Sequence, residues 1–238
     1  ADMSKYLDSG NEARIKKAYE SRDPRLQMAV ITPYAQYNGA SSGIAHTYTL
    51  RWPYRGSDSA EPFDIRTDTN DKFYYLWRKF VPEGLEQTER DTYGLDIPLI
   101  RYAEVLLLKA EALNEWGSTH ESEAIRCVNE VRRRAGHVEL NNATYPATKV
   151  NGQSDLRERI RNEYYWEIGG EDSMYFHELR WGTWKDKKFD NNRSGLMQMW
   201  GETTYTWYWL GDQCWSWPIP AKEMEMNSNL EQNEGWIN

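Results

Sequence analysis

The chain has 238 residues, a formal net charge of −8 and a pI near 5.2. This acidic balance provides no basic stripe of the kind that nucleic acid requires, so it argues against a nucleic-acid partner. The 12 Trp and 16 Tyr are more than a core of this size needs. Because Trp and Tyr can stack on flat ligands and still offer a polar group, the composition favours a ligand-binding surface.

The first third of the chain changes character at residue 33. Before it, polar helix formers predict a short helix over 12–19, Asp23 and Pro24 predict a turn or helix start, and a strand-like run follows over 27–32. Residues 33–71 are Tyr, Trp, Gly, Ser, Asp and Pro without a clear period, which predicts a long irregular segment. Its many aromatic residues argue against disorder. A short strand is expected within 73–80.

Residues 96–136 predict two helices joined by a very short connection, and we take this hairpin as the organising feature. Pro98 suits the first helical turn, and good helix formers continue to Trp116, before Gly117. Ser118 begins a capping-box pattern for the second helix. The first helix is apolar over most of its circumference, which predicts neighbours on more than one side. The hairpin is therefore expected to be one unit of a larger helical stack, with members partly or wholly outside this sequence.

A second pair of helices is expected further along the chain. Ser154 is the predicted N-cap of a third helix that stops at Gly169, and a fourth helix is expected over 173–181. Successive hairpins are typical of tetratricopeptide-type stacks, although no clean 34-residue repeat is visible. The sequence thus predicts one domain over 1–238. This domain is mostly α, with tetratricopeptide-like hairpins (about 97–136 and 154–182), irregular aromatic-rich loops (about 33–72 and 183–216) and few short strands.

The chain lacks the common catalytic motifs, and its four His residues are scattered without metal-ligand spacing, so neither a cofactor nor a metal site is predicted. Glu163 and Glu167 lie one helical turn apart and could form a glycosidase pair, but we expect them to bind arginines such as Arg159. Cys127 and Cys214 are expected to be buried thiols, with a disulfide as the alternative. No signal peptide, lipidation cysteine or apolar run of membrane length is present.

The aromatic segment around 34–55 is the strongest functional signal. Carbohydrate sites combine aromatic faces, on which the C–H side of a pyranose packs, with polar side chains that bind hydroxyls. The predicted glycan-binding residues of this segment are Tyr37, Asn38, Tyr48, Arg51, Trp52 and Tyr54. Less favoured candidates are Trp207 and Trp209. A helical scaffold that binds only protein and, less favoured, a glycoside hydrolase remain the alternatives.

Six segments, in order, resemble the SusD/RagB family of nutrient-binding outer-membrane lipoproteins from Bacteroidetes. They are DPRL (23–26), RKF (78–80), IPLIRYAEVLLLKAEALNEWG (97–117), EAIRCVNEVRRRAG (123–136), RERIRNEYYWEIGGEDSMYFHELRWG (157–182) and WPIPAKEMEMNSNLEQNEGW (217–236). The similarity is to the C-terminal part of the family. The chain departs from the family pattern at Tyr164, Asp172, Met174 and His177, where packing and ion pairing are the usual roles.

This resemblance implies a protein at the surface of the outer membrane that binds a glycan without cleaving it. It also implies a SusC-like TonB-dependent transporter as partner, which the protein covers as a lid. Membrane attachment would be through a lipid anchor that this sequence does not contain. The resemblance does not identify the glycan, because the binding residues of the family lie in variable loops.

Overall fold

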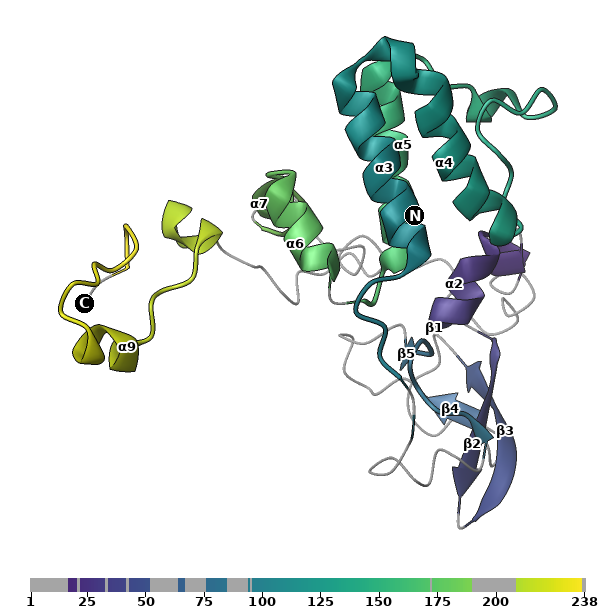
Figure 1. The fold of residues 1–238 in the computed structure, drawn as a ribbon. Coiled ribbons are helices and arrows are strands. Elements are labelled where there is room, and N and C mark those ends of the chain that lie inside the picture. The colour runs from purple at the N-terminus through teal and green to yellow at the C-terminus, as the bar shows by residue number, and fades with distance from the viewer. Residues whose placement is uncertain are drawn as a thin grey trace. The chain divides into compact units, whose positions relative to one another are not determined.

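The computed structural model describes residues 17–20, 22–32, 34–41, 43–51, 64–66, 76–84, 94, 96–171, 173–189 and 209–236. They belong to two compact units, one ending at Met174 and one beginning at Tyr175. The fold is mostly helical with few short strands, as predicted (Figure 1). The single domain over 1–238 stays a prediction.

A bundle of three helices forms the core of the first unit. Helices α3 (Tyr102–Trp116), α4 (Glu121–Arg134) and α5 (Gln153–Ile168) lie side by side (Figure 1). Their contact is made by fully buried apolar side chains, among them Leu107, Ala110, Val128, Leu156 and Ile160. Burial of one such large side chain stabilises the fold by roughly 1.5–3 kcal/mol. The predicted hairpin and third helix are confirmed.

The helix starts differ from the predicted ones. Arg101 is extended and precedes α3, which leaves Pro98 outside the helix, because the Arg101 guanidinium is tied to carboxylates at the end of α5. Ser118 opens a 3₁₀ turn, Ser118–His120, and does not cap α4 with its side chain. Gly152 has a φ of 85° and is followed directly by α5, so Ser154 lies within the first turn and is not its N-cap.

One side of α3 is covered by α4 and α5, whereas another side is apolar and solvent-exposed. The exposed side chains are Tyr102, Val105, Leu108 and Trp116. Glu104, one of the helix's few charged residues, is buried. Within the described part of the chain, the apolar circumference of α3 therefore has neighbours on one side only.

Residues 36–51 form a β-hairpin, so the predicted irregular segment is wrong there. Strands β2 (Gln36–Ser41) and β3 (Ile44–Arg51) are antiparallel, and β4 (Asp64–Arg66) pairs in parallel with β3. Gly43 in the connection has a φ of 76°, a conformation that glycine adopts without strain. Alternating side chains pair across the strands, as with Tyr37 opposite Tyr48. This cross-strand pairing outweighs the Gly- and Ser-rich composition that suggested a loop.

A second, two-stranded sheet connects the segments before and after the hairpin. The predicted helix start at Asp23 is confirmed, because its side chain accepts a 2.9 Å hydrogen bond from the Arg25 N–H at the start of α2 (Pro24–Ala29). The strand expected over 27–32 is reduced to β1 (Val30–Ile31), which pairs with β5 (Leu76–Trp77).

The second unit contains short helices. Helix α6 (Ser173–Arg180) confirms the predicted fourth helix, whereas α7 (Trp184–Lys188) lies in a stretch predicted to be irregular. Further short helices of this unit are η5 (Asp212–Trp215) and α9 (Ala221–Met226). In the first unit, η4 (Pro146–Thr148) lies in the α4–α5 connection. None of the described helices combines the length and hydropathy needed to cross a membrane.

Candidate functional site

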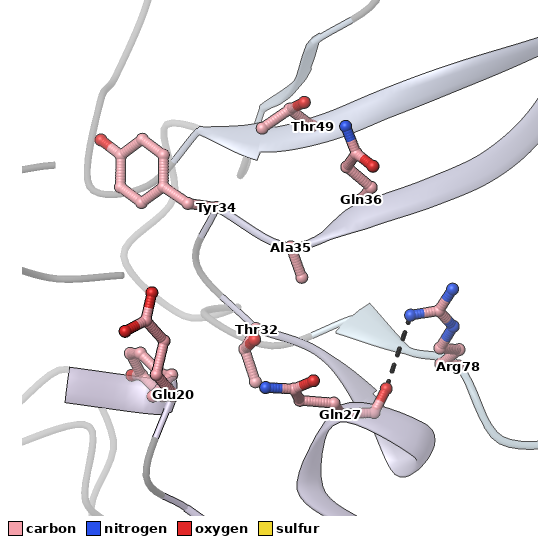
Figure 2. A pocket seen from close by; sticks show the side chains of 9 residues that line it. Glu20, Gln27, Thr32, Tyr34, Ala35, Gln36, Thr49 and Arg78 are labelled. Atoms are coloured by element: carbon pink, nitrogen blue, oxygen red, sulfur yellow. Dashed lines mark hydrogen bonds between the residues drawn. The ribbon is translucent and has the colours of Figure 1, made fainter. Parts of the chain in front are cut away.

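A pocket of about 530 Å³ opens beside the base of the β2–β3 hairpin (Figure 2). This volume lies within the range of roughly 300–1,000 Å³ typical of small-molecule sites. The lining residues are mostly polar or aromatic: Tyr19, Glu20, Gln27, Thr32, Tyr34, Ala35, Gln36, Thr49 and Arg78. We take this pocket as the candidate functional site and call it the hairpin pocket.

The hairpin positions one wall of the hairpin pocket. Gln36 and Thr49 are directly opposite each other in the β2–β3 register, so their side chains share one face. Just before β2, the Tyr34 N–H donates to the Leu50 carbonyl at 2.7 Å. Tyr34 has a φ of 62°, which aromatic residues rarely adopt and which costs energy. Figure 2 shows the Glu20 carboxylate pointing toward the Tyr34 ring across the pocket.

The opposite wall contains a cation that is already paired. Arg78 Nη1 donates to the Gln27 carbonyl at 3.5 Å, and Arg78 Nε donates to Glu83 Oε1 at 2.5 Å. The hydrogen bond from Arg78 lowers the pKa of Glu83, which therefore stays ionised at neutral pH. The Arg78–Glu83 pair adds no net charge to this wall.

The hairpin pocket presents neutral hydrogen-bonding groups next to aromatic rings. The amides of Gln27 and Gln36 and the hydroxyls of Thr32 and Thr49 can each donate and accept. Among its described lining residues Glu20 is the only carboxylate, whereas glycoside hydrolysis uses a pair. Across the described ranges, no group of three or more His, Cys, Asp or Glu side chains is arranged to hold a metal ion.

The predicted glycan-binding residues of the hairpin divide between its two faces. Tyr37 is 5% exposed and its hydroxyl donates to the Pro82 carbonyl at 2.9 Å, so it presents no ring face for stacking. Tyr48, opposite Tyr37, is half-buried and meets the His46 ring edge-on. Asn38 is exposed two residues beyond Gln36 and therefore extends the polar face of the pocket. Its side-chain oxygen accepts a 3.1 Å hydrogen bond from Thr47.

The other predicted residues lie elsewhere or outside the described residues. Arg51 is the last residue of β3, opposite Arg66 of β4. The side chain of Arg51 and all of Trp52, Tyr54 and Trp207 lie outside the described part of the structure.

Trp209 belongs to an aromatic cluster in the second unit. Its ring centroid is 5.1 Å from that of Phe189 and 4.9 Å from that of Trp215, and the Lys185 ammonium lies 5.3 Å from the Trp209 ring. Contacts on several sides give Trp209 a packing role within its own unit.

None of the described lining residues of the hairpin pocket is among the site residues predicted from the sequence. In the sequence, Tyr34 is noticeable only as part of an aromatic segment, and nothing marks Gln36 or Thr49 as site residues. The available signal is Ser42-Gly43, a turn pair flanked by alternating residues, which is typical of a hairpin. A hairpin centred on this pair places Gln36 opposite Thr49.

A buried ion network underlies the helical bundle. Glu163 on α5 has a fully buried side chain, and its carboxylate lies 2.8 Å from Arg25 and 2.8 Å from Arg132. The expectation that Glu163 and Glu167 bind arginines is confirmed. The suggested partner Arg159 is wrong, because that side chain binds Asp155, four residues earlier on α5.

Glu167 and Glu171 continue the network. The Glu167 carboxylate lies 2.9 Å from Arg101 and 3.1 Å from Arg25, and it also pairs with Arg134. Burial alone would raise the pKa of Glu167, but the hydrogen bonds from Arg101 and Arg25 and the charge of Arg134 outweigh it and lower the pKa. Glu171 pairs with Arg101 at 2.7 Å and with Lys79. Glu163, Glu167 and Glu171 therefore bind cationic side chains from segments that are distant in sequence.

Solved structures share the fold of this chain. A SusD-like protein from Bacteroides fragilis superposes with a TM-score of 0.58 and 22% identity, over 92% of this chain and 40% of that one. A SusD-like carbohydrate binding protein from the same species gives a TM-score of 0.53 and 24% identity, over 95% of this chain and 44% of that one. Both likenesses concern the fold.

Curated relatives match at the sequence level. SusD-like protein P38 of Formosa agariphila is 32% identical over 58% of this chain and 24% of its own length. The starch-binding protein SusD of Bacteroides thetaiotaomicron is 28% identical over 67% of this chain and 25% of its own length. The chain thus spans about a quarter of the length of these relatives. A sequence model of the SusD family matches residues 4–236, and the chain belongs to this family.

Proposed function

We propose that this chain is part of a protein that binds a glycan and does not cleave it. The observation that supports this most directly is the hairpin pocket, where neutral amides and hydroxyls line a volume of about 530 Å³ beside Tyr19 and Tyr34. Amides and hydroxyls match the donors and acceptors of sugar hydroxyls, and a tyrosine ring offers an apolar face. Membership of the SusD family and the names of its starch- and carbohydrate-binding relatives support the same function.

The proposed ligand set combines the pocket with its extension along the hairpin. Tyr34, Gln36 and Thr49 contact the first sugar, and Asn38 contacts a neighbouring one. Arg51, Trp52 and Tyr54 follow β3 in sequence and stay part of the proposed set. Trp207 and Trp209 are less favoured candidates for binding the glycan.

The proposed setting is nutrient uptake at the cell surface. A SusC-like TonB-dependent transporter in the outer membrane is the proposed partner, and the glycan is passed to it. Family membership supports this setting.

The test is a titration of the chain with a panel of soluble neutral glycans, followed by intrinsic Trp fluorescence, with a reducing-end assay on the same samples. The informative variant is Tyr34→Gly, because glycine adopts the positive φ of this position and only the ring is lost. Its matched control is Tyr145→Gly, an exposed tyrosine in the α4–α5 connection.

Saturable binding without new reducing ends is expected, with affinity lowered roughly two- to tenfold by Tyr34→Gly, as expected for one stacking ring, and unchanged by Tyr145→Gly. New reducing ends would identify a hydrolase. No binding to any glycan would favour a helical scaffold that binds protein, for which the exposed apolar side of α3 is the specific supporting observation.

A further inference from the structure

A second pocket, of about 300 Å³, lies at the solvent edge of the ion network. Its described lining includes four cationic side chains, those of Arg25, Lys79, Arg101 and Arg134. The same described lining includes a single carboxylate, that of Glu167. In a chain with a net charge of −8, such a concentration of cations around one cavity is unexpected from composition. We call it the cationic pocket.

The carboxylates behind the cationic pocket do not balance its cations. Within the described part of the chain, the network contains five cationic side chains and four carboxylates: Arg25, Lys79, Arg101, Arg132 and Arg134 with Asp23, Glu163, Glu167 and Glu171. Burial and the charge of Arg132 lower the pKa of nearby His137, so its imidazole adds no charge at neutral pH. Among these described residues, cations therefore outnumber carboxylates by one.

This excess charge is accessible at Arg134. The Arg134 side chain is 59% exposed, whereas that of its partner Glu167 is 3% exposed and also binds Arg25 and Arg101. A guanidinium has five N–H donors in a planar fork, more than one shared carboxylate oxygen can accept. Arg134 can thus contact an incoming anion while it stays paired with Glu167.

The rim of the cationic pocket is apolar and aromatic. Trp166 is 45% exposed, Phe80 37% and Met28 72%. The Arg132 guanidinium lies 5.9 Å from the centroid of the Trp166 ring. Phe80 has a φ of 61°, an unfavourable conformation for an aromatic residue. A ligand that fits here has an apolar face and a negative charge close together.

We propose that the cationic pocket binds an anionic pyranose, with its acidic group on Arg134 and its C–H face on Trp166. This proposal deepens the proposed function, on which it rests, by assigning an acidic residue to the bound glycan. A volume of about 300 Å³ is at the lower end for small-molecule sites and suits a single ring. A planar carboxylate can accept two parallel N–H bonds from guanidinium, and a sulfate ester offers similar oxygens.

The test uses isothermal titration of the full chain with three disaccharides, namely digalacturonate, a sulfated galactobiose and neutral galactobiose. The variant is Arg134→Gln, and the matched control is Arg133→Gln, the neighbouring exposed arginine that pairs with Glu139. Thermal unfolding of each variant checks that it is folded. Trp166→Ala tests the stacking surface, with Trp116→Ala, an exposed tryptophan on α3, as its control.

We expect an acidic disaccharide to bind more tightly than galactobiose, and Arg134→Gln to lower its affinity about tenfold or more. Arg133→Gln should leave the affinity unchanged. Tighter binding of digalacturonate would identify a uronate, and tighter binding of the sulfated sugar would identify a sulfate ester. Equal affinity for all three sugars, or equal effects of the two arginine variants, would overturn the proposal.

The failure of this proposal can be separated from failure of the proposed function. If neutral glycans bind and respond to Tyr34→Gly while Arg134→Gln has no effect on any acidic sugar, only the cationic pocket is disproved. If no glycan of either kind binds, both proposals fall.

Discussion

At the α3–α5 bundle the Glu163 carboxylate is buried and paired with arginines, whereas the hairpin pocket is lined mainly by neutral amides and hydroxyls. A buried charge needs a partner, because its desolvation costs several kcal/mol. The buried carboxylates of Glu163 and Glu167 on α5 therefore have a structural role. The groups of the hairpin pocket can exchange water for a ligand at low cost.

The two regions also differ in how the sequence reveals them. The network residues Arg25, Lys79, Arg101, Arg132 and Glu167 all lie in the segments that carry the family resemblance. Of the residues that line the hairpin pocket, only Arg78 lies in one of these segments. The motifs that identify the family thus describe its architecture, and the ligand chemistry lies between them.

The largest effect is expected from breaking the network at its centre. Glu163→Ala removes the buried carboxylate that Arg25 and Arg132 share and should lower the free energy of unfolding by about 3–5 kcal/mol. Urea unfolding of the two forms measures this change in the free energy of unfolding. Glu158→Ala on the same helix, which removes an exposed carboxylate paired with Arg161, should have no measurable effect. Equal effects of the two variants would show that the network adds no stability.

The apolar core of the bundle gives the next largest effect. Leu107 is fully buried, whereas the adjacent Leu108 is 40% exposed. Leu107→Ala should lower the free energy of unfolding by about 2–5 kcal/mol, because it removes contacts and leaves a cavity. Leu108→Ala should lower the free energy of unfolding by clearly less than Leu107→Ala does. A comparable loss from both would indicate that the exposed side of α3 is covered in solution.

Acid should weaken the bundle through Glu167. Its folded pKa lies below the ordinary value of 4.5, so its stabilising contribution is present above pH 4.5 and is lost as the pH falls through the folded pKa. Between the folded and the unfolded pKa of Glu167, unfolding takes up one extra proton. The free energy of unfolding therefore falls by about 1.4 kcal/mol for each pH unit of acidification in this range. Urea unfolding from pH 6 to pH 2 should show this slope, and Glu167→Gln should reduce it. An unchanged slope would contradict the assignment to Glu167.

The smallest effect is expected at the hairpin and separates its two faces. Asn38→Ala should weaken binding of a neutral glycan by about 0.5–1.5 kcal/mol, the worth of one hydrogen bond. Tyr48→Ala, on the other face, should leave the affinity unchanged. Fluorescence titration provides the measurement, with thermal unfolding of both variants. A larger loss from Tyr48→Ala than from Asn38→Ala would move the site to the opposite face.

The helices follow from local propensity, whereas composition hides the hairpin and leaves the Ser42-Gly43 pair as its local signal. The helices within 97–136 form from neighbours in sequence, so local propensity and the stop at Gly117 were sufficient to predict that they exist, although not where they start. The hairpin depends on pairing between residues such as Gln36 and Thr49, which are distant in sequence.

Among the predicted site residues, Asn38 lies on the face that continues the hairpin pocket, whereas Tyr37 is buried. Composition identified an aromatic segment but could not say which rings face solvent, because a shift of one residue in a strand reverses the face. The pocket also takes Tyr19 and Gln27 from a different segment, and no local pattern connects these to the hairpin.

The order of charges along the chain has a consequence for synthesis. Every cation of the network, from Arg25 to Arg134, precedes Glu163 and Glu167 of α5 and also Glu171, which follows α5. During translation, the chain therefore contains the arginines of the bundle before it contains their main partners, and burying them then would be costly. A nascent chain that stops before residue 163 has no means of completing the bundle. The ion network can therefore be completed only after α5 and Glu171 have been synthesised.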